Sequence, residues 1–523
     1  MRRLVLVAAI LVLGSCQPGP PAVKVNGETL VGKYVSGDQV WAFLGVPFAE
    51  PPVGDLRWRA PQPLISSGGP RDVTEFAPAC MQTMRILDWY RYLAELFGGA
   101  ADYYEDLEVS EDCLYLNVWT TTLDDDARKP VMVWIHGGSN KSGWSYEPNY
   151  HGHKLANEGV IVVSVGYRQG VFGFFSHPDM NPDEAVANFA YRDIIAALEW
   201  IQANIHEFGG DPDRVTLFGE SAGAQNIIDL MFAKRASGLL HRAITQSTPR
   251  FGLSQSSSLA AERERAMGLA EALNLHDTSL EALRDVPAEE LLEAYTNAFP
   301  SYYHVAAIDG QLFHKTAWSK SEVGDMPRIP LLIGTNDHEW YDSLPDDTDW
   351  DVVADRAASL ESMDGEAALQ LVQNEQDPQR ALDRLITADR YVCKAQHLAN
   401  RKNRLVGSTW VYHFTRVRED PAARNELGAY HGAEYPYVFG THDSYMKTTA
   451  TDLELEATMQ SYWVTFAKTG NPNSEATPQW PLFVGDQPLV QDLGDTVKPK
   501  SAPEPELCAL FEAWHAENYV PAN

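Results

Sequence analysis

Ser221 is the residue of this chain best placed to do chemistry. It stands in the sequence Gly-Glu-Ser-Ala-Gly at 219–223, between a strand-like apolar run at 214–218 and a helical segment at 225–232. Glycines two residues to either side permit a tight strand-to-helix turn that lifts the serine hydroxyl clear of a sheet. The N-terminus of the following helix would favour negative charge developing there. The pattern predicts a nucleophilic serine.

A second segment is suited to hold the oxyanion that such a nucleophile would create. The apolar run 131–135 is followed by His-Gly-Gly-Ser at 136–139. Attack on an acyl carbon places negative charge on the carbonyl oxygen, which preorganised backbone N–H groups stabilise. We expect the donors to be Gly138, Ser139 and Ala222.

The elements that must position these residues alternate between strands and helices. Short apolar runs predict buried parallel strands at 114–119, 131–135, 161–165 and 214–218. Between the last two, residues 188–206 carry apolar side chains at helical spacing and end in a Gly-Gly-Asp-Pro stop. Strand, helix and strand in repetition predict an α/β fold with a doubly wound sheet. Residues 23–57 alternate in polarity, which predicts antiparallel strands at a sheet edge.

Two later stretches, 257–299 and 354–400, are amphipathic and helical in pattern. They are separated by a strand-like run at 329–333. We expect these helices to pack over the strand ends, where a lid or a pocket wall would lie.

Four further motifs carry a family resemblance. They are Gly-Val-Pro-Phe-Ala at 45–49, Glu-Asp-Cys-Leu-Tyr-Leu-Asn-Val at 111–118, Phe-Gly-Gly-Asp-Pro at 208–212 and Phe-Ala-Lys-Thr-Gly-Asn-Pro at 466–472. With the serine motif, the chain resembles the type-B carboxylesterase and cholinesterase family, in its bacterial para-nitrobenzyl-esterase-like branch. The resemblance implies an α/β-hydrolase fold, with a mostly parallel central sheet and helical excursions forming the pocket wall.

The same resemblance implies the partners of Ser221. The family's acidic triad member corresponds to Glu339, which follows an apolar strand, with Asp337 as the alternative. The base corresponds to His431, in Gly-Ala-Tyr-His-Gly-Ala-Glu at 428–434. The chain order of serine, acid and histidine is the one that α/β-hydrolases share. The implied reaction is hydrolysis of carboxylic esters through an acyl-enzyme.

The chain also departs from the family pattern. Ser139 replaces the third glycine of the oxyanion loop, and Asn140 replaces the aromatic residue after it. We expect altered backbone freedom and an altered pocket wall, but a surviving oxyanion hole, because backbone N–H groups form it. Cholinesterases hold choline against a tryptophan, and the corresponding position here is Tyr103. A tyrosine is the weaker cation partner.

Cysteine usage indicates an oxidising compartment. Beyond Cys16 the chain has four cysteines, so two disulfides are expected, and counting alone allows three pairings. The family resemblance implies the pairs Cys80 with Cys113 and Cys393 with Cys508.

The N-terminus predicts export. Two arginines precede an apolar run at 4–13 that is too short to span a bilayer, and the run ends in Leu-Gly-Ser before Cys16. We expect a lipoprotein signal peptide at 1–15, lipidation of Cys16, a tether at 16–22 and one hydrolase domain at 23–520. The mature chain would be a bacterial lipoprotein facing the periplasm or the cell exterior. An ordinary cleaved signal with an incidental cysteine is the alternative.

Charge and composition limit the partners. The net charge of −31 repels nucleic acid and anionic lipid, so we expect neither as a partner and membrane contact only through the N-terminal anchor. A small-molecule ester is the expected substrate, with no cofactor and no metal. Two alternatives stay open: a binding module on the same fold, disfavoured because all three triad residues are present, and a lipase, thioesterase or amidase with the same triad. The sequence does not indicate an oligomeric state.

Overall fold

The computed structural model describes residues 19–518 except 36, 38, 67, 101, 250–255, 346 and 422. The expected signal peptide at 1–15 and Cys16 lie outside the described residues. In the described part of the chain, no helix combines the length and the apolar character that crossing a membrane requires.

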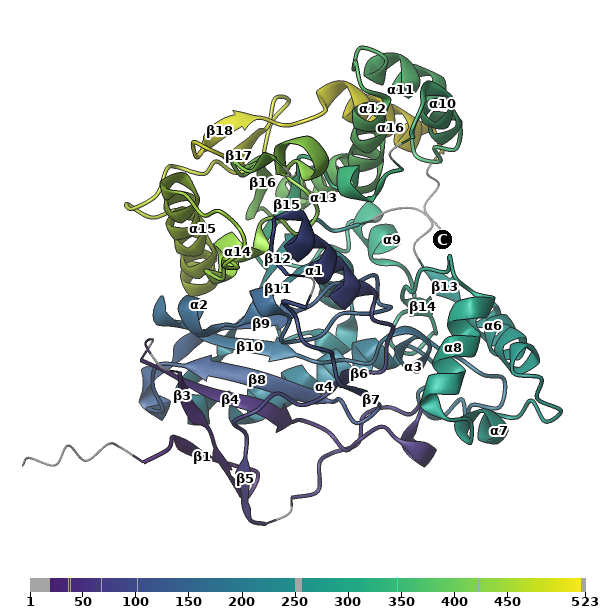
Figure 1. The fold of residues 1–523 in the computed structure, drawn as a ribbon, viewed down its shortest axis with the longest axis vertical. Coiled ribbons are helices and arrows are strands. Elements are labelled where there is room, and N and C mark those ends of the chain that lie inside the picture. Colours follow the sequence, from purple (N-terminus) through teal and green to yellow (C-terminus); the bar gives the residue numbers. More distant parts are fainter. Residues whose placement is uncertain are drawn as a thin grey trace, which may run out of the picture.

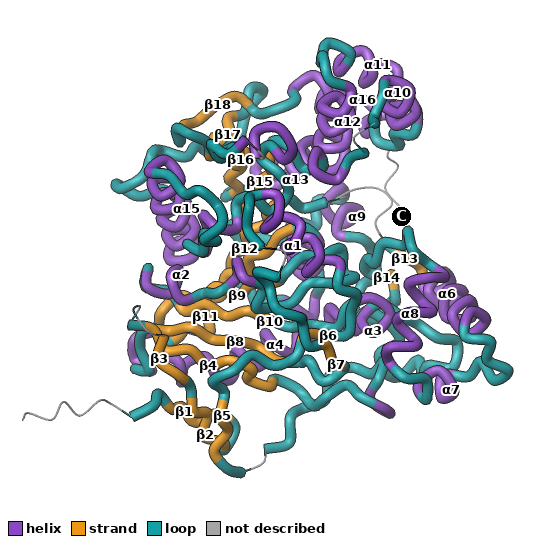
Figure 2. Tube along the Cα trace, in the orientation of Figure 1, coloured by secondary structure: helices purple, strands orange, loops and turns teal. Residues whose placement is uncertain are grey.

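A mixed sheet forms the centre of the molecule (Figures 1 and 2). Within the described residues it has 11 strands in the order β18-β17-β16-β15-β12-β11-β9-β10-β8-β4-β3. In chain order these are β3 (Lys33–Val35), β4 (Val40–Pro47), β8 (Tyr115–Thr120), β9 (Lys129–Ile135), β10 (Ile161–Val165), β11 (Gly210–Glu220), β12 (Arg242–Gln246), β15 (Leu331–Asn336), β16 (Thr409–Phe414), β17 (Leu489–Leu493) and β18 (Lys498–Ser501).

The strands from β10 through β9, β11, β12, β15 and β16 to β17 pair in parallel, as expected for the runs at 131–135, 161–165 and 214–218. The parallel prediction for 114–119 is wrong, because β8 is antiparallel to both β10 and β4. A strand buried on both faces has the same apolar pattern in either direction. Only residues 121–128 separate β8 from β9, and a crossover between parallel strands needs a dozen residues or more.

Smaller sheets lie around the central one. Strands β1 (Ala22–Val25), β2 (Glu28–Val31) and β5 (Pro70–Asp72) form the first. Two short pairs are β6 (Ala79–Cys80) with β7 (Val109–Ser110), and β13 (Ser257–Ser258) with β14 (Ala307–Ile308).

Helices cover both faces of the sheet and extend beyond its ends (Figure 1). They are α1 (Arg85–Leu96), α2 (His153–Asn157), α3 (Gly170–Gly173), α4 (Phe189–Asn204), α5 (Ala222–Met231), α6 (Leu259–Ala272), α7 (Leu280–Arg284), α8 (Ala288–Ala298), α9 (Ala317–Glu322), α10 (Trp350–Ala358), α11 (Gly365–Val372), α12 (Pro378–Thr387), α13 (Cys393–Leu405), α14 (Tyr435–Phe439), α15 (Ala450–Thr469) and α16 (Pro505–Asn518). The group α6–α8 lies at one end of the molecule, and α10–α12 with α16 at another.

Alternation along β9 places its side chains in two hydrophobic cores, one on each face of the sheet. Val133 and its neighbours two residues away pack with α4 on one face of the sheet. Met132 and Trp134 pack with α15 on the other face. Successive side chains of a strand point to opposite faces, so one uniformly apolar run serves both cores. This packing fixes the strand end from which the oxyanion loop begins.

Candidate active site

Ser221 occupies a sharp turn between β11 and α5. Its φ of 52° and ψ of −126° lie in a region that residues other than glycine rarely adopt, at a cost of order 1–3 kcal/mol. A Cβ on Gly219 would lie 2.5 Å from the carbonyl oxygen of Ile135, and one on Gly223 would lie 2.1 Å from it. Both glycines are therefore required by the closeness of β9, and together they hold the serine above the strand end.

Glu339 lies three residues beyond β15 and is buried. Its Oε1 accepts a hydrogen bond from the backbone N–H of Asn336 at 2.8 Å. Its Oε2 lies 2.6 Å from Nδ1 of His431, which donates to it. The alternative acid, Asp337, instead pairs with Nε2 of His413 at 3.2 Å. The contact with His431 therefore favours Glu339 over Asp337.

The other ring nitrogen of His431 faces a second carboxylate. Nε2 lies 3.0 Å from Oε1 of Glu220, the residue before the serine. The other oxygen of Glu220 accepts a hydrogen bond from the hydroxyl of Tyr435. Among the described residues, no hydrogen bond joins Ser221 to His431. Catalytic hydrogen bonds are often long in the absence of substrate and tighten when it binds.

The electrostatics of His431 follow from these neighbours. Burial alone would lower its pKa, but the negative charges of Glu220 and Glu339 outweigh burial and raise the pKa well above its ordinary value of 6.5. A third carboxyl group nearby, that of Glu434, is also affected: burial and the charge of Glu220 raise its pKa to about 7. Glu434 accepts hydrogen bonds from Gln246 and Asn336.

The segment expected to be the oxyanion loop follows β9 in an unusual conformation. Gly138, Ser139 and Asn140 have φ values of 98°, 62° and 56°, all in the left-handed region. Ser139 thus adopts the conformation that the family's glycine would favour. Among the described residues, the N–H groups of Gly138, Ser139 and Ala222 are used by no other hydrogen bond. Gly138 and Ser139 line the cavity, whereas Ala222 is buried directly after Ser221.

Side chains hold this loop from several directions. Arg85 donates from its guanidinium to the carbonyl oxygen of Gly138 at 2.9 Å. Asn140 is buried, accepts from Nδ2 of Asn226 at 2.9 Å and donates to the carbonyl oxygen of His304 at 3.1 Å. We expected the replacement at Asn140 to alter the pocket wall. The side chain instead supports the loop from behind and does not line the pocket.

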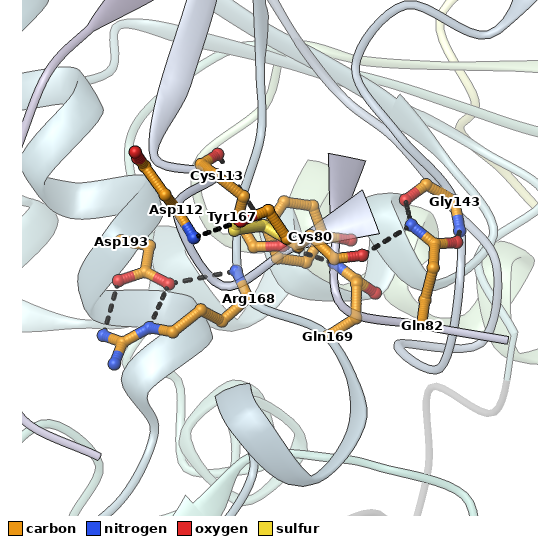
Figure 3. Close-up of a disulfide and its surroundings, with 10 residues drawn as sticks. Cys80, Gln82, Asp112, Cys113, Gly143, Tyr167, Arg168, Gln169 and Asp193 are labelled. Atoms are coloured by element: carbon orange, nitrogen blue, oxygen red, sulfur yellow. Dashed lines mark hydrogen bonds and ion pairs between the residues drawn. A yellow bond between two sulfur atoms is a disulfide. The ribbon is translucent and has the colours of Figure 1, made fainter. Parts of the chain in front are cut away.

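The first disulfide lies beside the far end of this loop (Figure 3). Cys80 is bonded to Cys113, and Cys393 to Cys508, the pairs that the resemblance implied. Two residues after Cys80, Gln82 donates to the carbonyl oxygen of Gly143 at 2.8 Å and accepts from its N–H at 2.6 Å. The amide of Gln82 fastens the chain before α1 to the chain after the oxyanion loop, and the disulfide fastens the same segment to Cys113, just before β8.

Ser221, Glu339, His431, Gly138 and Ser139 all line one cavity of about 500 Å³. The wall is helical, as expected, but α1 supplies much of it, whereas residues 257–299 supply none of the described lining. Sequence reasoning missed α1 as a wall. Its apolar and aromatic run, which includes Ile86, Leu87, Trp89 and Tyr90, was the available signal.

Tyr103 is not part of this cavity. It is 40% exposed, its ring packs against Tyr104 and Tyr445, and its hydroxyl is 3.0 Å from that of Ser444. The residue at the position that corresponds to the cholinesterase tryptophan therefore does not line the cavity. Trp89 is the tryptophan that α1 presents to the cavity.

The sheet, the serine turn and the facing histidine loop define the class of the protein: it is an α/β-hydrolase. The Carboxylesterase family model matches residues 19–510, and the chain belongs to that family, as a type-B carboxylic ester hydrolase.

Individual relatives agree with this assignment. The chain is 34% identical to the fumonisin B1 esterase of Sphingopyxis macrogoltabida, over 91% of this chain and 88% of that protein. It is 34% identical to the para-nitrobenzyl esterase of Bacillus subtilis (strain 168), over 88% of this chain and 91% of that protein. A solved thermophilic PNB esterase superposes with a TM-score of 0.80 at 31% identity, covering 94% of this chain and 99% of that one.

Proposed function

We propose that this carboxylesterase works through a triad of Ser221, His431 and Glu339 and a covalent acyl-enzyme. The contact between Nδ1 of His431 and Oε2 of Glu339, in the cavity that also exposes Ser221, carries the proposal. It favours the tautomer in which Nε2 is free of a proton and can act as a base.

In the proposed reaction, Oγ of Ser221 attacks the acyl carbon of the ester while its proton passes to Nε2 of His431. The N–H groups of Gly138, Ser139 and Ala222 stabilise the oxyanion. The intermediate collapses, the C–O bond to the alcohol breaks, and the imidazolium returns the proton to the departing alcohol. Water, activated by Nε2, then hydrolyses the acyl-enzyme and restores Ser221.

The cavity supports small-molecule esters with apolar or aromatic groups as substrates. Trp89, Tyr90, Tyr92, Trp340 and Tyr391 contribute to its wall. Aromatic rings bury large apolar areas and stack on aryl groups. The relatives hydrolyse, by their names, fumonisin B1 and para-nitrobenzyl esters. Aryl esters are therefore the first class to assay, beside alkyl esters of graded chain length, thioesters and amides.

Substitution of the serine tests the mechanism. Ser221→Ala should lower the turnover of a para-nitrophenyl ester by at least about 10³-fold and abolish labelling by a fluorophosphonate probe, while thermal unfolding stays unchanged. Labelling of the wild type would also exclude a purely binding function, because the probe requires an activated serine. Retention of a tenth of the activity in Ser221→Ala would refute the assignment.

We also propose that the mature protein is exported and anchored through a lipid on Cys16, as a single hydrolase domain from about residue 23 to 520. The two disulfides support an oxidising compartment. Wild-type protein should partition into detergent with a membrane fraction, whereas Cys16→Ala should be released or left unprocessed. An unmodified mature N-terminus at another residue would refute the anchor.

A further inference from the structure

Two histidines and two glutamates meet among three helices of the C-terminal half. Glu322 ends α9, His397 lies in α13, and Glu512 and His515 lie in α16. None of the four lines the active-site cavity. We expected no metal from the sequence, in which Glu322, His397 and His515 are far apart and form no recognisable motif.

The side chains converge closely. Nε2 of His397 lies 2.9 Å from Oε1 of Glu322, and Nε2 of His515 lies 3.2 Å from Oε2 of the same carboxylate. One ligand atom from each of the three residues lies within 4.8 Å of the other two. The side chains of Glu322, His397 and His515 are only 6–8% exposed. The ligand atoms are already gathered and largely shielded from water.

The second disulfide helps to set this geometry. Cys393 precedes His397 by four residues on α13, and Cys508 precedes Glu512 by four and His515 by seven on α16. Residues separated by four or seven positions lie on one face of a helix. The bond from Cys393 to Cys508 therefore brings the face that bears His397 against the face that bears Glu512 and His515.

Glu512 occupies the position of a supporting partner. Its Oε1 lies 2.8 Å from Nδ1 of His397, the ring nitrogen that does not face Glu322. Histidines that bind metals through one nitrogen usually donate the other N–H to a carboxylate or carbonyl, which fixes the ring and its tautomer. The pair of His397 and Glu512 has this arrangement before any metal is bound.

Arg401 opposes metal binding through its charge. Its guanidinium lies 3.3 Å from Oε2 of Glu322 and also donates to the carbonyl oxygens of Ser321 and Glu322. With neutral histidines, the two carboxylates and Arg401 sum to −1, so a divalent ion changes the charge of the cluster to +1. Two protonated histidines give the same +1. A divalent ion therefore adds no more charge than full protonation of the histidines does.

We propose that Glu322, His397 and His515 form a binding site for a divalent transition metal of the zinc type. Nε2 of each histidine and one oxygen of Glu322 are the protein ligands, and water completes the tetrahedral shell. Imidazole ligands favour zinc, cobalt or nickel over calcium or magnesium, which prefer oxygen. The ion would link α9, α13 and α16 beside the Cys393–Cys508 disulfide and add to stability, outside the ester-hydrolysing site.

The test uses the full mature chain, dialysed against EDTA and then titrated with zinc chloride in a calorimeter. One zinc per chain should bind, and the unfolding temperature should rise with zinc concentration. Cobalt chloride should give the visible absorption of a tetrahedral site. His397→Ala and His515→Ala should each remove the saturable binding. Glu512→Gln should weaken it about 10- to 100-fold, and Arg401→Gln should strengthen it.

His206→Ala is the matched control, because His206 is an exposed histidine that also pairs with a carboxylate, that of Glu207. Its zinc binding should equal that of the wild type. Esterase activity should survive in each variant and serves as the test of folding. If His515→Ala fails that test, His515→Gln is the milder substitution at the same position. Two results would show an ion-pair cluster only and overturn the proposal. One is the absence of saturable binding at micromolar zinc, and the other is binding by His397→Ala and His515→Ala that equals binding by the wild type.

Discussion

Nε2 of His431 lies 3.0 Å from a carboxylate oxygen of Glu220, so the proposed base stands between two acids, with Glu339 on its other nitrogen. Glu220 directly precedes the nucleophile, and Tyr435 holds its other oxygen. In the proposed mechanism, the arrangement would stabilise the imidazolium that forms when Ser221 attacks. It also opposes loss of the proton from the resting enzyme, so it should determine the pH range of activity.

Replacing Glu220 should move that range. The raised pKa of His431 means that the inactive imidazolium persists to higher pH, so the acid limb of kcat/KM should have its midpoint above 6.5 in the wild type. Glu220→Gln removes one negative charge and should shift the midpoint to lower pH, with a lower plateau because the imidazolium is less stabilised. Glu207→Gln, at an exposed carboxylate, should leave the profile unchanged. An acid limb that stays fixed in Glu220→Gln would contradict the coupling.

The two adjacent loop positions should respond differently to substitution. In Gly138→Ala the new Cβ would lie 1.9 Å from the carbonyl oxygen of Ser142, so the oxyanion loop must shift and kcat should fall by about 10²- to 10³-fold. Ser139→Gly places glycine at a φ of 62° and should keep kcat within a few-fold of wild type. Steady-state kinetics on one aryl ester compares them. Equal losses in both variants would contradict this account of the loop.

The two disulfides should contribute unequally to stability. The chain-entropy model gives about 5 kcal/mol for the bond from Cys393 to Cys508, whose cysteines are 115 residues apart, and about 4 kcal/mol for Cys80 to Cys113, which are 33 apart. Urea unfolding of each Cys→Ser pair measures the losses, and removal of a native disulfide typically costs about 2–5 kcal/mol. Only loss of the first bond should also reduce activity, because Gln82 and the oxyanion loop lie beside it.

Choline esters should not be preferred substrates. Tyr103 lies outside the cavity, and the charge of Glu220 is engaged by His431 and Tyr435. Neutral short-chain esters should therefore match or exceed acetylcholine in kcat/KM. A preference of about 100-fold for the choline ester, some 2.7 kcal/mol, would reveal a cation site. Trp89→Ala would then test whether α1 forms it, since Trp89 faces the cavity.

The sequence alone determined the local features that depend on short-range chemistry. The glycines around Ser221, the apolar runs of β9, β10 and β11 and the cysteine count all predicted their structures, because each depends on backbone freedom or burial within a few residues. Family resemblance added Glu339 and His431, which the structure brings into contact. The direction of β8 was predicted wrongly, because burial on both faces carries no information about strand direction.

Only the tertiary structure decided which distant residues meet. Glu220 and His431 are 211 positions apart, and their contact joins the end of β11 to the loop that precedes α14. The cavity wall formed by α1 and the cluster of Glu322, His397 and His515 likewise join segments with no local relationship. Such contacts depend on how helices and strands pack, and the pattern of any single segment does not encode that packing.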